Sequence, residues 1–248
     1  MSEYFYCNYK TDYKFTDLLN LFGLQAQLDI NNIPESMSDI IEESKDLFLE
    51  HAKISIKYTF MDIDKLNENE IIICPPTNFP DVEPKNQSND FFNSKYTLKG
   101  TLLPTILKDC HKVCLYILTV DGYDKIQEFC KDDIMLSFFA DAWGSAYAEA
   151  ADNHFRGELR SDIENQNLYL TISHNPGQHL FPLTNQKVFF DILNPKELNL
   201  KLTESCLMLP SKSISAVCGI SKTPQDLSKV SCDYCSMKDT CPSAYAAS

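Results

Sequence analysis

The chain has 248 residues, of which 44% are hydrophobic, and it carries 22 basic against 35 acidic side chains, a net charge of −13. This length predicts one large domain, or one and a half small ones, with enough apolar residues for a sizeable core. So acidic a chain argues against a nucleic-acid partner, because phosphate contacts need clustered lysine and arginine, and it is compatible with docking on a basic protein surface.

Neither end nor middle of the sequence predicts export or membrane insertion. The first residues, Met1 to Phe15, lack a basic segment followed by an apolar one, so no secretory signal is expected. No run of 18 apolar residues exists, so no membrane span is expected. Ten cysteines without a secretion signal predict reduced thiols in a cytoplasm.

The first third of the chain predicts two helices and two strands. Residues 1–35 are expected to be an N-terminal extension with a short helix over 16–26. A second helix is predicted over 39–51, with Asp39 as its N-cap and Glu42 completing a capping box. Apolar and polar residues then alternate over 54–60, which predicts a half-buried strand, and 70–74 predicts a short buried strand.

The middle of the chain predicts a loop, two strands and a long helix. Residues 76–95 are rich in Pro, Asn, Asp and Ser and predict a surface loop, followed by strands over 96–102 and 113–120. An alanine-rich stripe predicts a helix over 132–156 that packs closely on a neighbour. Gly144 in this helix costs about 1 kcal/mol relative to alanine, so another backbone or a ligand is expected to approach there. Trp143 is expected in the core.

The last third predicts a strand over 168–172, a helix over 184–193, a short extended piece at 208–209 and a strand over 214–220. The order of elements predicts a single α+β domain with a mainly antiparallel twisted sheet and packed helices. The predicted boundaries are 36–220 for this domain and 221–248 for a cysteine-rich C-terminal tail.

Four short motifs follow one another between Asn175 and Ile220. They are a Pro-Gly turn, Pro-Leu-x-x-Gln-Lys before an amphipathic helix, Leu-Thr-Glu-Ser, and Met-x-Pro-Ser-Lys-Ser before an alternating strand. Together with the alanine-rich helix Phe139 to Asp152, this order resembles the activation (reactivation) domain of cobalamin-dependent methionine synthase. The resemblance covers about 38–220, and the cysteine-rich tail is similar to that of stand-alone relatives from anaerobes.

The resemblance implies a function. Domains of this family close over an inactivated corrinoid and allow S-adenosylmethionine to remethylate it after one-electron reduction. It implies that 173–183 and 208–216 face the corrinoid, which a partner protein presents. It also implies eight cofactor-binding residues: Glu149, Ser173, Pro176, Gly177, Gln178, Glu204, Ser211 and Lys212.

The turn departs from the family pattern at two positions. The family has Arg-x-x-Pro-Gly-Tyr, whereas this chain has Ser173 and Gln178 in the Arg and Tyr positions. In the family the Arg meets the carboxylate of S-adenosylmethionine, and a serine cannot form that bidentate pair. His174 or His179 could supply a donor, although both also fit exposed loop histidines. Binding of S-adenosylmethionine is therefore left open.

Several of these residues could also have a purely structural role. Glu149 also fits a buried salt-bridge partner or a solvated helix face, and Glu204 a hydrogen-bonding residue at a strand end. The segment around Ser211 and Lys212 follows a proline and fits either a plain turn or an anion-binding turn with free N–H groups.

Three cysteines near the C-terminus, Cys232, Cys235 and Cys241, have the spacing C-x2-C-x5-C. Three thiolates suit zinc or an iron–sulfur cluster, and an unliganded tail is the remaining alternative. Cys218 is the predicted fourth ligand, with Cys206 and His179 as alternatives. A [4Fe–4S] cluster is favoured over zinc, because corrinoid reduction needs a low-potential electron and zinc has no redox chemistry.

Two hypotheses from different classes follow. The first is reductive reactivation of a corrinoid methyltransferase or methionine synthase, with an electron passed through the cluster to cob(II)alamin. The second is a non-catalytic module that binds a corrinoid protein and holds a structural zinc or iron–sulfur site. A third hypothesis, an enzyme that acts on another small molecule in the same cleft, is supported by fewer residues. The sequence does not decide whether the chain is an enzyme.

Overall fold

The computed structural model describes residues 4–6, 9, 15–76, 94–178, 180–229 and 231–240. The predicted loop over 76–95, His179 and Cys241 therefore lie wholly or largely outside the described residues. Within them, no helix is long and apolar enough to cross a bilayer.

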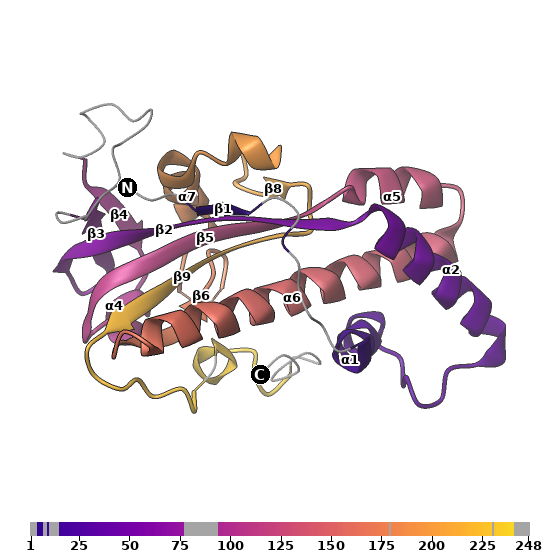
Figure 1. Cartoon of the computed structure of the whole chain (residues 1–248), viewed down its shortest axis with the longest axis horizontal. Helices are drawn as coiled ribbons and strands as arrows, with labels where there is room; N and C mark the ends of the chain where they lie inside the picture. The colour runs from indigo at the N-terminus through magenta and orange to yellow at the C-terminus, as the bar shows by residue number, and fades with distance from the viewer. Residues whose placement is uncertain are drawn as a thin grey trace.

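One antiparallel sheet of seven strands forms the centre of the molecule (Figure 1), with the order β4-β3-β2-β5-β9-β6 and β1 paired with the first half of β2. Strands were predicted within the ranges of β2, β3, β4, β5, β6 and β9, whereas β1 was not predicted. The half-buried strand predicted over 54–60 is wrong in one respect: Ser55, Lys57 and Thr59 are as buried as the apolar residues between them, because the sheet is covered on both faces. Their bounds are β1 Tyr4–Tyr6, β2 Lys53–Leu66, β3 Glu70–Cys74, β4 Tyr96–Lys99, β5 Cys110–Asp121, β6 Tyr169–His174 and β9 Ser213–Ser221. Edge strand β6 leads directly into the Pro-Gly turn.

Helices cover both faces of the sheet (Figure 1). On one face Tyr116 and Leu118 of β5 point toward the long helix α6, and on the other Leu115 and Ile117 pack toward α7. This alternation gives two apolar clusters, one on each side of the sheet. The helices are α1 Phe15–Ala26, α2 Glu35–His51, α4 Leu103–Ile106, α5 Tyr123–Cys130, α6 Ile134–Glu164 and α7 Gln186–Leu193. The single α+β domain with a mainly antiparallel sheet is confirmed.

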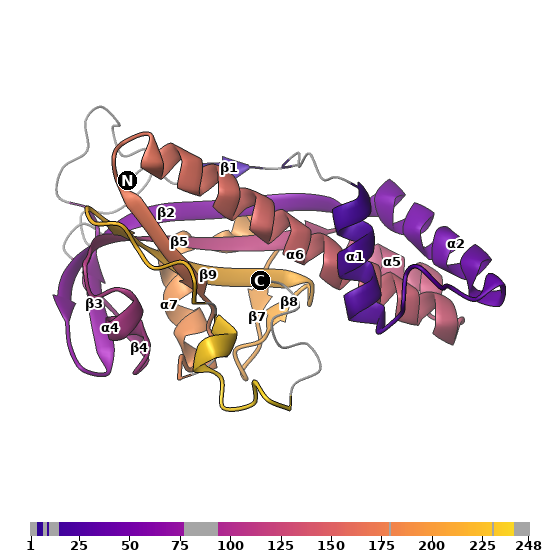
Figure 2. The same cartoon turned by 90° about the horizontal axis from the view of Figure 1, so that it is seen from below.

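Short elements complete the fold. A two-stranded hairpin, β7 Lys201–Leu202 with β8 Met208–Leu209, precedes β9, and 3-10 turns η1 Leu183–Asn185 and η2 Pro195–Leu198 flank α7. The tail folds back over the molecule and forms a last turn, η3 Ser231–Tyr234, beside β6 (Figure 2).

Two helix boundaries differ from the predictions. Helix α2 begins at Glu35 rather than at Asp39, because extended Pro34 stands immediately before it, and no side chain caps it. The proposed capping box of Asp39 and Glu42 is therefore wrong. Helix α6 begins at Ile134 after its N-cap Asp133, whose carboxylate accepts hydrogen bonds from two first-turn N–H groups, and it continues to Glu164 because apolar residues recur past 156.

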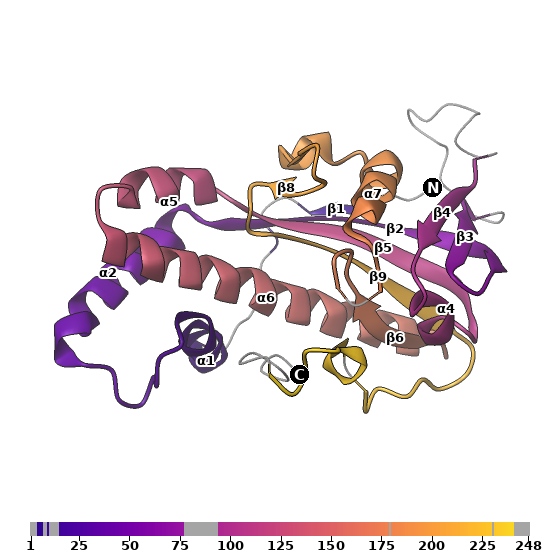
Figure 3. The same ribbon diagram turned by 180° about the vertical axis from the view of Figure 1, so that it is seen from behind.

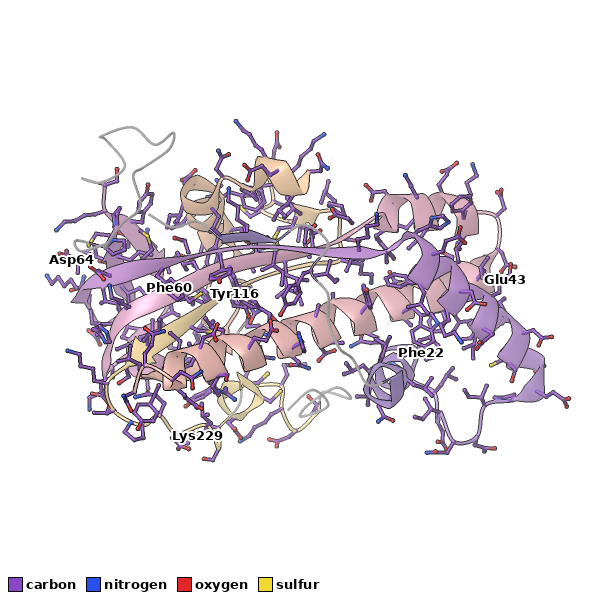
Figure 4. The ribbon with its side chains drawn as sticks, viewed as in Figure 1. Phe22, Glu43, Phe60, Asp64, Tyr116 and Lys229 are labelled. Carbon is purple, nitrogen blue, oxygen red and sulfur yellow. The ribbon has the colours of Figure 1, made fainter. Side chains whose placement is uncertain are left out.

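Helix α1 lies within the main core. Phe22 is fully buried and stacks on Trp143, with ring centroids 4.0 Å apart and an interplanar angle of 17° (Figure 4 labels Phe22). The core position predicted for Trp143 is confirmed. The domain boundaries at 35 and 220 remain predictions.

Candidate functional site

The Pro-Gly motif forms a tight turn at the end of β6. Gln178 N donates to Asn175 O at 2.9 Å, and Gly177 has a φ of 97°. Proline followed by a residue with positive φ is the arrangement of a type II turn. Gly177 N donates in turn to Phe181 O at 2.8 Å, which fixes the chain that leads away from the turn. The sequence motif therefore specifies a rigid turn.

Replacing Gly177 with alanine is expected to weaken this turn. An L-residue in the left-handed region costs about 1–2 kcal/mol, and the added Cβ would lie 3.3 Å from Leu183 Cδ1. We expect the free energy of unfolding to fall by about that amount in urea titrations. Gly157 is the matched control because an added Cβ there meets nothing within 4 Å, so Gly157→Ala should be neutral or stabilising. An equal loss in both variants would contradict this role of the turn.

His174 is not the exposed loop residue that the sequence suggested. It is the last residue of β6, is fully buried, and stacks on Phe181 with ring centroids 5.3 Å apart and an interplanar angle of 14°. The loop-like composition of the next residues hides the fact that the strand continues through His174. The stack holds the start of the turn against the chain that follows it.

The positions that depart from the family pattern lie on and beside this turn. Ser173 is half-buried in β6, opposite Cys218 of β9, while Pro176 is buried. Gln178 is exposed, and its side-chain oxygen accepts from Asn175 N at 3.4 Å. Thus Ser173, Pro176, Gly177 and Gln178 form one continuous segment at the sheet edge.

Glu149 lies on α6 beneath α1. Gln25 Nε2 of α1 donates to Glu149 Oε2 at 3.0 Å. Burial raises the pKa of Glu149 above its ordinary value, and the hydrogen bond from Gln25 opposes that shift without cancelling it. Glu149 is thus half-buried and bonded to a neutral side chain, which matches neither the buried salt-bridge partner nor the solvated helix face, and its role toward a cofactor stays a prediction.

The raised pKa of Glu149 predicts a pH-dependent effect of Glu149→Gln. A carboxyl whose folded pKa is raised contributes stability that is fully present below its unfolded pKa and is lost as the pH rises through the folded pKa. We expect Glu149→Gln to be stabilising or neutral at pH 7 and destabilising or neutral near pH 4. Urea unfolding of both proteins at the two pH values measures this difference. A variant that is less stable at pH 7 than at pH 4, relative to wild type, would contradict it.

Lys212 fastens the loop between β8 and β9 to α6. Its Nζ lies 2.8 Å from Asp141 Oδ1 and donates to Ser145 Oγ at 2.7 Å. Tyr123 OH also donates to Asp141 Oδ1, at 2.6 Å. Burial acts to raise the pKa of Asp141, but the hydrogen bonds from Lys212 and Tyr123 outweigh it, so that pKa lies below its ordinary value. We call these four residues the lysine clasp.

The clasp explains Gly144. A Cβ at this position would come within 3.0 Å of Lys212 Cε and of Tyr123 Cε2, so the close approach expected from the sequence is that of a lysine side chain. Glu149 follows Ser145 by one helical turn, and the two therefore share a side of α6. Sequence reasoning missed Asp141, Ser145 and Tyr123, although the four-residue spacing of Asp141 and Ser145 was a visible signal.

Of the two remaining predicted contacts, Glu204 is exposed in the loop between β7 and β8, and exposed Ser211 precedes half-buried Lys212. The structure does not join Glu204 to the turn at Gly177 through any described hydrogen bond.

The tail cysteines form a compact turn. Cys235 N donates to Cys232 O at 2.9 Å, and Met237 N donates to Cys235 Sγ at 3.2 Å. Both thiols are half-buried. Hydrogen bonds from N–H groups to cysteine sulfurs are among the contacts that tune iron–sulfur centres.

The predicted fourth ligand is elsewhere. Cys218 is fully buried between the sheet and α6, and burial raises the pKa of its thiol to about 12. Cys206 is also buried, at the β7–β8 hairpin. Across the described part of the chain, no three His, Cys, Asp or Glu side chains gather into a metal-binding group. The structure thus brings Cys232 and Cys235 together and leaves Cys218 apart.

No family model and no curated protein matches the sequence. Among solved structures, the chain is similar to the MetH reactivation domain bound to AdoHcy, with a TM-score of 0.53 and 13% identity over 88% of this chain and 78% of that chain. A likeness at this identity establishes the fold. The chain has a reactivation-domain fold, and its kinship with stand-alone proteins of anaerobes remains a prediction.

Proposed function

We propose that this protein reactivates a corrinoid enzyme by docking on the domain that presents its cobalamin. The observation that carries the proposal is the fold shared with the MetH reactivation domain over most of both chains. The Pro-Gly turn and the Pro-Ser-Lys-Ser segment, which resemble motifs of that family, supply the expected contact. Function in the cytoplasm and a corrinoid-binding partner follow from the same proposal.

Exposed apolar side chains support the proposed contact. Leu180 directly follows the Pro-Gly turn region, and Leu209 ends the hairpin before the Pro-Ser-Lys-Ser segment; both are exposed. Exposed large apolar residues in these two segments fit a surface that covers a partner. Thr101 N donates to Leu180 O at 3.2 Å, and this hydrogen bond holds the backbone of Leu180 in place.

The tail supplies the proposed electron source. The turn at Cys232 and Cys235, with its N–H···S hydrogen bond, fits a metal-binding knuckle, and Cys241 would add a third thiolate. A bound [4Fe–4S] cluster would supply one low-potential electron for cob(II)alamin. Buried Cys218 does not fit as the fourth ligand, because it lies within the core and belongs to no group of metal-binding side chains among the described residues.

The metal content tests this part of the proposal. Protein purified without air should be brown, contain about four irons and matching sulfide, and bleach on addition of dithionite. A colourless protein with one zinc would instead support the second candidate, a non-catalytic clamp with a structural metal. A protein without metal would remove the electron source from this chain.

The methyl donor can be tested separately. AdoHcy is bound by the MetH domain, and the same pocket here would have Ser173 where the family has arginine. Lys212, the cation of the Pro-Ser-Lys-Ser motif, is engaged by Asp141. Binding of the methyl donor is therefore tested apart from docking, since in the clamp candidate S-adenosylmethionine no longer binds.

Calorimetric titration with AdoHcy and with S-adenosylmethionine distinguishes the two candidates. Binding that is lost in Gly177→Ala and kept in Gly157→Ala would support remethylation at the Pro-Gly turn. No binding by wild-type protein would favour the clamp.

A further inference from the structure

A second exposed apolar surface lies at the other end of the molecule from β4 and α4. It comprises Phe129 of α5 and Ile134, Met135 and Phe138 of α6, which we call the tip patch. Ile134 is 85% and Phe129 61% exposed, while the other two are about half exposed. Single exposed apolar residues are common on protein surfaces, but four large ones within ten residues indicate an interaction site.

The tip patch is held on a rigid frame. Ile134 and Phe138 are one helical turn apart and share a side of α6. Asp133 caps the helix and its N–H donates to Cys130 O at 3.0 Å, so the last turn of α5 stays next to the first turn of α6. Figures 1 and 3 both show α2, α5 and the start of α6 together at this end.

Exposed acidic side chains are concentrated on the elements at this end of the molecule, and we call them the acidic collar. Helix α2 and the segment 123–133 together carry ten exposed acidic side chains against three lysines, which gives these two segments seven of the thirteen net negative charges of the chain. Two of the lysines, Lys45 and Lys131, are paired with Glu42 and Glu128. Figure 4 labels Glu43 on α2, at this end of the molecule.

From this combination we infer that the tip patch is a docking surface for a protein partner whose contact is apolar at its centre and rimmed by lysine and arginine. In such an interface the apolar centre provides the surface that is buried on binding. The complementary charges orient the partner and raise the association rate. A second copy of this chain would bring two acidic collars together. An anionic lipid surface would be repelled in the same way.

The variant Ile134→Asp separates apolar docking from diffuse charge attraction. The probe is a synthetic amphipathic helix with leucine on one side and lysine on its flanks, labelled for fluorescence anisotropy. A matched peptide carries glutamate in place of lysine. Aspartate in the first turn of α6 suits the helix dipole, so the variant should fold, and far-UV circular dichroism checks this.

We expect the lysine peptide to bind wild-type protein at least about ten-fold more tightly than the glutamate peptide, and less tightly as salt rises. Ile134→Asp should weaken the lysine peptide about ten-fold although it adds a negative charge. Leu227→Ser, an exposed apolar residue in the tail, is the control and should leave binding unchanged.

Several outcomes would overturn the inference. Unchanged or tighter binding by Ile134→Asp would mean that only diffuse acidity attracts the peptide. Sedimentation showing a wild-type dimer that Ile134→Asp converts to monomer would assign the tip patch to a second copy. Binding to zwitterionic lipid vesicles that requires Ile134 would assign it to a membrane surface.

Discussion

If the tail holds the proposed iron–sulfur cluster, replacing Cys235 with alanine is expected to remove the iron and to abolish reduction of cob(II)alamin, while the thermal unfolding midpoint changes little. Cys235 is half-buried, its sulfur accepts the N–H of Met237, and it belongs to neither apolar cluster of the core. Loss of one thiolate from a cluster of three is enough to release the metal. Iron and sulfide analysis, the visible spectrum and a thermal melt measure the three effects.

Cys74 provides the matched control. It is also half-buried but ends β3, away from the tail. Cys74→Ala should therefore keep the iron and the reducing activity. If Cys235→Ala retained both, the tail would not be the electron route.

Replacing Asp152 with alanine is expected to lower the free energy of unfolding by about 3 kcal/mol, the low end of the cost of removing one partner from a buried charge pair, because the Arg156 side chain is partly exposed. Asp152 is buried between α6 and the sheet. It accepts a hydrogen bond from Tyr116 OH at 2.6 Å and one from Arg156 Nε at 2.9 Å. Burial and the nearby carboxylate hold the pKa of Tyr116 well above its ordinary value. Figure 4 labels Tyr116, which lies between β5 and α6.

Two further variants calibrate the Asp152 result in urea titrations. Glu128→Ala removes an exposed ion pair with Lys131 and should change stability by at most about 1 kcal/mol. Tyr116→Phe removes one hydrogen bond and should fall in between, at about 1–2 kcal/mol. A loss below about 1 kcal/mol for Asp152→Ala would mean that the network does not stabilise the sheet against α6.

The regular parts of the fold could be predicted because their signals are local. The alternation over 54–60 and the alanine stripe of α6 identify a strand and a helix by their periods. The burial of the polar side of β2 could not be predicted in the same way, because it depends on a distant segment whose Glu197 pairs with Lys57. Element ends were less predictable. Asp39 and Glu42 have the spacing of a capping box, but Pro34 already fixes the entry to α2.

Only those parts of the candidate site that lie within one continuous segment could be predicted from the sequence. The turn at Pro176 and Gly177 folds as the motif indicates. The lysine clasp instead joins Lys212 to Asp141, which lie far apart in sequence. Gly144 indicated that some group packs closely on α6, but the sequence did not indicate that this group is the Lys212 side chain. The burial of His174 depends on Phe181, which reaches it only after the chain has turned.

The most direct test of corrinoid reactivation follows cob(II)alamin by visible absorption, without air, in the presence of S-adenosylmethionine and a limiting reductant. The account predicts that the protein accelerates conversion to methylcobalamin many-fold over the same mixture without protein, and that Cys235→Ala does not. A rate that is independent of the protein would contradict the account.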